Sequence, residues 1–150
     1  MQNFQQNIAN IMMRIEAAAK LAQRNPSDIT LMAVSKTRTA EDVQLAATYG
    51  MGSFGENYLQ EASTKIDALR HLPLEWHFIG PIQSNKTKPV AESFAWVHSI
   101  DRHKIAQRLS DQRPPHLSPL NICLQVNIDR ETSKSGIMIE ETMETALAVS

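Results

Sequence analysis

The fold of this 150-residue chain is decided first by residues 29–36, ITLMAVSK. The run is short, apolar and rich in branched side chains, which predicts a buried β-strand. It closes on Lys36, so an ammonium group stands at the carboxyl end of this strand. A lysine that is desolvated there loses part of its preference for the charged form, and a neutral amine can attack an aldehyde to form a Schiff base. The alternative is a lysine whose stem follows the strand while its ammonium group reaches water.

Similar apolar runs recur along the chain at even spacing. Before the first run, apolar residues three and four apart predict an amphipathic helix from about Asn3 to Arg24. Strand-like runs then lie near residues 29–35, 52–55, 75–79, 95–99 and 120–127, and the segments between them have helical spacing. Successive strands begin 20–25 residues apart, which is the length of a strand with its crossover helix. The pattern predicts five βα units and a parallel sheet.

Two parallel architectures fit this pattern, the doubly wound sheet and the (β/α)8 barrel, and both place chemistry at the carboxyl ends of their strands. The chain has no Gly-x-Gly-x-x-Gly motif after the first strand and no Gly-x-x-x-x-Gly-Lys-Ser/Thr motif. The sequence therefore argues against a dinucleotide fold and a phosphate loop, and it favours the TIM-barrel type. Polar residues predicted at the strand ends are Lys36, Glu56, Asn57, residues 80–86, Ser99, Asp101 and Asn127.

Composition limits the classes of function. An apolar fraction of 42% and a charged fraction of 21% predict one ordinary globular domain. A net charge of -1 gives no electrostatic reason to expect nucleic acid binding. We find neither a signal peptide nor an apolar run long enough for a membrane span, so we expect a cytoplasmic protein. The single cysteine, Cys123, lies in an apolar run and predicts a buried, inert thiol, and the histidines have no metal-binding spacing.

Three stretches carry a resemblance to a known family: AVSKT at residues 33–37, FGENY at 54–58 and WHFIGPIQSNK at 76–86. The resemblance continues in the same order through HSID at 98–101 and the segment 127–136. Over essentially its whole length the chain resembles the pyridoxal phosphate homeostasis protein family. The resemblance implies a barrel similar to the N-terminal domain of alanine racemase, with pyridoxal 5'-phosphate (PLP) held on Lys36 as an internal aldimine.

The family continues past the point where this sequence stops. The resemblance therefore implies that residues 1–150 form a single partial PLP-binding barrel domain with the first five βα units, preceded by the N-terminal helix. A complete barrel takes about 250 residues. In the family the cofactor phosphate is held by a Ser/Thr- and Gly-rich turn beyond the late strands. We therefore expect open sheet edges through which chains can associate, and a cofactor held more weakly than in a longer member.

Other candidate cofactor-binding residues are Asn57, His77 and Asn127. Each asparagine follows a predicted strand, where it can cap the next helix or contact a ligand. His77 lies in an apolar run, where it can be a core histidine bonded to a backbone group or can stack on a ring. Glu61, Lys65 and Asp67 are predicted to lie on a solvated helix face.

Three functions fit these observations. The first is a PLP-binding protein that carries or buffers the cofactor in vitamin B6 homeostasis, through a Schiff base on Lys36, without a committed reaction. The second is a PLP-dependent racemase of the alanine racemase type, which needs acid and base groups on both faces of the substrate carbon. In the two-domain racemases a second domain supplies one of these groups, which argues against this function here. The third is a cofactor-free Schiff-base aldolase.

Overall fold

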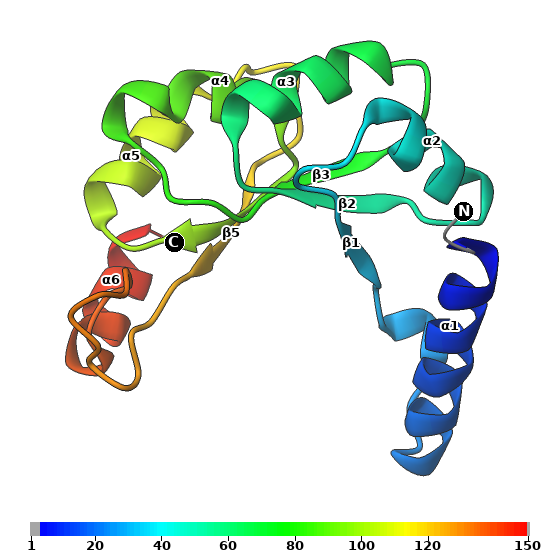
Figure 1. The fold of residues 1–150 in the computed structure, drawn as a ribbon. Helices are drawn as coiled ribbons and strands as arrows, with labels where there is room; N and C mark the ends of the chain where they lie inside the picture. Colours follow the sequence, from blue (N-terminus) through cyan, green and yellow to red (C-terminus); the bar gives the residue numbers. More distant parts are fainter. Residues whose placement is uncertain (1–3, 150) are drawn as a thin grey trace.

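A computed structural model describes residues 4–149 and shows a five-stranded parallel sheet (Figure 1). Neighbouring strands follow chain order, from β1 at one edge to β5 at the other. Every pairing between neighbours is parallel. The strands are β1 (Met32–Val34), β2 (Ser53–Glu56), β3 (Glu75–Phe78), β4 (Trp96–Ile100) and β5 (Asn121–Leu124). All five predicted strands are confirmed.

Four helices connect the strands, and two more lie outside them. The connecting helices are α2 (Ala40–Thr48), α3 (Leu59–Ala68), α4 (Thr87–Ser93) and α5 (His103–Gln112). The outer helices are α1 (Phe4–Leu21) and α6 (Thr142–Val149), and short 3-10 turns lie at η1 (Pro26–Asp28), η2 (Ser84–Lys86) and η3 (Ile139–Glu141). The predicted N-terminal helix is confirmed as α1, whereas Asn3 lies outside the described residues. No helix within residues 4–149 has the length and apolar character that a membrane crossing requires.

The layering decides between the two parallel architectures. In Figure 1 the helices α2–α5 lie together over one face of the sheet, and α1 and α6 lie beyond the two edge strands. A doubly wound sheet carries helices on both faces and reverses its strand order, whereas a (β/α)8 barrel keeps sequential order with helices only outside. The chain therefore forms five consecutive units of a TIM-barrel type fold, as predicted.

The hydrophobic core lies between the sheet and the helices. From the strands it receives Phe54, Trp76, Phe78 and Val97, which pack against apolar residues of α2–α5. The rings of Phe54 and Trp76 lie 5.8 Å apart between centroids. Because side chains alternate along a strand, the residues between these core positions point to the opposite face, which we call the inner face. There Gly55 pairs with His77, and His77 with Trp96.

Candidate functional site

Lys36 lies two residues beyond the end of β1, in a turn. The sheet ladder continues past the strand, because the Ser35 N–H donates to the Gly55 carbonyl at 3.0 Å. Ser35 is buried and its hydroxyl bonds to Glu56, whereas Lys36 belongs to the turn that follows. The Lys36 side chain is exposed and forms no ion pair within the described part of the chain. The exposure agrees with the second of the two alternatives, in which the ammonium group reaches water, and the desolvated lysine is not observed.

Beneath this turn lies a buried cluster of charged groups. Lys65 of α3 is 4% exposed, and its Nζ donates to three oxygens: the Ser35 carbonyl at 2.7 Å, Glu56 Oε1 at 2.8 Å and Glu61 Oε1 at 2.6 Å. The Ser35 hydroxyl also donates to Glu56 Oε1, at 2.6 Å. All three N–H donors of the ammonium group are thereby used. The cluster links the turn after β1 to the end of β2 and to α3.

Glu61 ties the other side of the turn to the same cluster. Its Oε1 accepts the Thr37 N–H at 2.7 Å as well as the Lys65 ammonium. The hydrogen bond from Lys65 lowers the pKa of Glu61 below its ordinary value. The prediction that Glu61, Lys65 and Asp67 lie on a solvated face is therefore wrong for Lys65, which is buried, whereas Asp67 is exposed and Glu61 is intermediate. The i,i+4 spacing of Glu61 and Lys65 was visible in the sequence, but the buried partner Glu56 comes from a strand end that helix periodicity does not report.

Asn57 follows β2 and does not cap the helix after it. The N-cap of α3 is Tyr58, without a side-chain cap. Asn57 Oδ1 is buried and has no hydrogen-bond partner within residues 4–149. The backbone of Asn57 lies against Gly80, where an added Cβ would stand 2.2 Å from the Asn57 carbonyl oxygen. Glycine is therefore required at position 80 for the ends of β2 and β3 to approach.

A pocket of about 650 Å³ opens beside these strand ends. Besides Asn57, its polar lining comes from residues of the next βα loops, including Lys86, Asp101 and Arg102. Lys36 is not among its lining residues. Asn57 thus lines a pocket at the carboxyl ends of the strands. Lys36 lies outside this pocket, just beyond the carboxyl end of the neighbouring strand β1.

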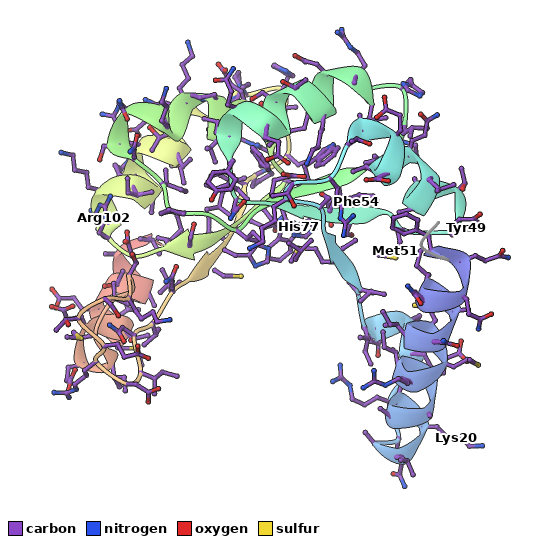
Figure 2. All side chains as sticks on the ribbon, viewed as in Figure 1. Lys20, Tyr49, Met51, Phe54, His77 and Arg102 are labelled. Carbon is purple, nitrogen blue, oxygen red and sulfur yellow. The ribbon has the colours of Figure 1, made fainter. Side chains whose placement is uncertain are left out.

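His77 belongs to β3 and lies on the inner face, the side of the sheet away from the helices α2–α5 (Figure 2). Its Nδ1 lies 2.9 Å from His98 Nε2, and its Nε2 lies 3.0 Å from the Glu75 carboxylate. The imidazole also stacks on Trp96, with 5.9 Å between ring centroids. His77 is thus a buried core histidine, although its hydrogen-bond partners are side chains and not the predicted backbone group, and stacking on a cofactor ring stays a prediction. Burial, and after it the nearby His77, lower the pKa of His98. This pair was not visible in the sequence, because the two residues belong to different strands.

Asn127 organises its own loop after β5. Its Oδ1 accepts the Glu131 N–H at 3.2 Å, and its Nδ2 donates to the carbonyls of Glu131 and Lys134. Its side chain therefore closes a local loop and does not cap the next helical turn, whose N-cap is Met138. Contact between Asn127 and a cofactor stays a prediction.

Two further predictions concern sulfur and metal ligands. Cys123 is half-buried, so the expectation of a fully buried thiol is too strong. Within the part of the chain that the structure describes, no group of three or more His, Cys, Asp or Glu side chains is placed to hold a metal ion.

Comparison with known proteins gives close relatives. The chain is 57% identical over 149 residues to the pyridoxal phosphate homeostasis protein of Pseudomonas aeruginosa, and 51% identical over 152 residues to that of Escherichia coli. Each match covers 99% of this chain and 65% of the relative. The chain thus spans about two thirds of the length of these relatives.

A solved structure agrees in fold and sequence. PipY of Synechococcus elongatus, determined with PLP bound, superposes with a TM-score of 0.68 at 36% identity, covering 82% of this chain and 57% of PipY. The resemblance predicted from the sequence is thereby confirmed. The family model described as alanine racemase, N-terminal domain, matches residues 3–150, and the chain therefore belongs to that family.

Proposed function

We propose that this chain binds PLP and carries or buffers it, with Lys36 as the point of covalent attachment. The observation that carries the proposal is the state of the Lys36 amine. It stands exposed at a strand end without an ion-pair partner in the described residues, whereas the buried amine of Lys65 next to it has all its donors used. An amine that is held close to a carboxylate reacts poorly with an aldehyde, so Lys36 is the better nucleophile of the two.

The residues around Lys36 fit such a group. Asn57 Oδ1 is a buried acceptor with no donor among the described residues, which is costly unless a ligand supplies one. A bound molecule with an N–H or O–H group at the rim would satisfy it. His77 and Asn127 are already hydrogen-bonded to protein groups, and we propose for them only supporting roles.

The cofactor supplies an aldehyde when bound. The Lys36 Nζ forms a bond with the aldehyde carbon, and the carbonyl oxygen leaves as water. The chain's own contribution is to hold the amine just beyond the carboxyl end of β1, where the Ser35 N–H continues the ladder to Gly55.

We propose a binding role without a committed reaction. The support is that the relatives in Pseudomonas aeruginosa and Escherichia coli are named homeostasis proteins and that PipY has been determined with PLP bound. We further propose the cytoplasm as the location, no nucleic acid partner in view of the net charge of -1, and association between chains through the open edges β1 and β5.

Titration of the 150-residue chain with PLP tests this proposal. We expect a new visible absorption band of the Schiff base that disappears on borohydride reduction, and no D-alanine from L-alanine by the loaded protein. D-alanine formation would instead favour the racemase. Cleavage of an aldol substrate without PLP, combined with no band on titration, would favour the aldolase.

A further inference from the structure

The buried charged cluster of Lys65, Glu56 and Glu61 has no part yet in the proposed function. Its ion pairs join α3 to the end of β2, whereas the Lys36 side chain is exposed and takes no part in them. Burying charged groups costs solvation, and apolar replacements are often as stable. Glu56 Oε2 is also buried without a partner among residues 4–149. Packing alone therefore explains this cluster poorly.

The cluster forms hydrogen bonds with the residues on both sides of Lys36. Before it, the Ser35 carbonyl accepts the Lys65 ammonium at 2.7 Å and the Ser35 hydroxyl donates to Glu56 at 2.6 Å. After it, the Thr37 N–H donates to Glu61 at 2.7 Å. Three hydrogen bonds to charged groups thus fix the two residues that flank Lys36, and such bonds are stronger than neutral ones.

The turn also needs to be held, because its conformation is unfavourable. Thr37 has a φ of +64°, a left-handed conformation that a β-branched residue rarely adopts. Strained backbone of this kind persists where the surroundings over-determine it, and it concentrates at functional sites. The carboxylate of Glu61, itself held by Lys65, supplies that restraint at the N–H of the strained residue.

We propose that Lys65, through Glu61 and Glu56, is a positioning residue that fixes the turn carrying Lys36 and so presents the Lys36 amine at the rim in one orientation. The consequence for the cofactor rests on the proposed function, but the fixing of the turn does not. Loss of the cluster should leave a folded chain in which the peptide at Thr37 opens more often and the Lys36 amine is less well placed.

The test compares the full 150-residue chain with Lys65→Met and Glu61→Ala. The matched control is Lys88→Met, since Lys88 and Glu92 also form an i,i+4 pair, but an exposed one on α4. Backbone amide exchange at Thr37 is measured by NMR. PLP is then added, trapped with borohydride, and the modified lysines are quantified by mass spectrometry. Glu61→Gln serves as the conservative variant, because its amide oxygen can still accept the Thr37 N–H.

We expect Thr37 exchange to accelerate about tenfold or more in Glu61→Ala and Lys65→Met, the factor expected for loss of a hydrogen bond to a charged group. Trapping at Lys36 should fall by a similar factor relative to trapping at Lys86, the control should match wild type, and Glu61→Gln should recover part of both signals. If Lys65→Met does not fold, the half-buried Glu61 variants decide the outcome. Unchanged Thr37 exchange in a folded Glu61→Ala chain would overturn the proposal. Absence of PLP trapping in wild type would contradict the proposed function alone, because the exchange measurement still tests the turn.

Discussion

The backbone N–H of Thr37 donates to the carboxylate of Glu61 at 2.7 Å, although 24 residues separate them in the sequence. The bond joins the turn after β1 to the first turns of α3, the helix that follows the neighbouring strand β2. Lys65 forms an ion pair with the same carboxylate, and both residues belong to α3. Helix α3 therefore fixes the backbone next to Lys36. The strand end that carries the amine is thus placed by a different βα unit from its own.

Glu61 should make the fold sensitive to acid. The hydrogen bond from Lys65 lowers the pKa of Glu61 below its ordinary value of 4.5. A group whose pKa is lowered by folding contributes stability that is present above its unfolded pKa and is lost as the pH falls through its folded pKa. Urea unfolding should therefore show wild type more stable than Glu61→Gln at neutral pH, with the difference shrinking below pH 4.5. A difference that stays constant on acidification would show that the charge of Glu61 does not matter.

Protonation of His98 should lower the free energy of unfolding as the pH falls below 6.5, before the loss that involves Glu61 begins. Burial and the facing His77 lower the pKa of His98 from its ordinary value of 6.5. Folding therefore favours the neutral imidazole, so its contribution is complete above pH 6.5 and is lost as the pH falls toward the folded pKa. Thermal unfolding of His98→Gln should depend less on pH than that of wild type in this range. The same substitution at the exposed His116 should leave the profile unchanged, and equal profiles for wild type and His98→Gln would refute the prediction.

Gly80 should be far less tolerant of a side chain than Gly52. At Gly80 an added Cβ would lie 2.2 Å from the Asn57 carbonyl oxygen, whereas at Gly52 it would meet nothing within 4 Å. Gly80→Ala must push the ends of β2 and β3 apart and should lower the free energy of unfolding by about 1–3 kcal/mol. Gly52→Ala should change it by less than about 0.5 kcal/mol, as is usual for surface positions. Denaturant unfolding of both variants measures the contrast, and equal effects would contradict the close approach.

The 150-residue chain should bind PLP more weakly than the full-length Pseudomonas aeruginosa relative, of which it spans 65%. In barrels of this type the phosphate site is commonly built by loops after the late strands. The edges at β1 and β5 should also promote association between chains. Equilibrium dialysis with PLP and light scattering after size-exclusion chromatography measure the two effects. A compact monomer with the affinity of the relative would show that both expectations fail.

The helices and strands could be predicted from the sequence because short patterns of apolar residues mark them. Apolar spacing of three and four marks α1, and short apolar runs mark the five strands. The even spacing of these runs predicted parallel pairing, and the absence of a glycine-rich phosphate loop favoured the barrel over the doubly wound sheet. Each of these inferences depends on short patterns and on their spacing along the chain, and none requires a contact between side chains of different units.

The site was harder to predict because its contacts join different units. Lys65 reads as a surface residue from its helix alone, and its burial depends on Glu56, which belongs to β2. His77 and His98 meet only because β3 and β4 are paired. Lys36 is exposed in the turn after β1, an edge strand, and the composition of residues 29–36 does not reveal that position.

The central claim is that Lys36 is the residue that binds PLP covalently. The most direct measurement is borohydride reduction of the PLP-treated chain, followed by peptide mapping of wild type, Lys36→Ala and Lys86→Ala. Lys86 is the matched control, because it is an exposed lysine of the same rim and lines the neighbouring pocket. We predict that the label lies mainly on Lys36, that Lys36→Ala loses it, and that Lys86→Ala retains it. A label found mainly on Lys86 or Lys134, and retained in Lys36→Ala, would contradict the account.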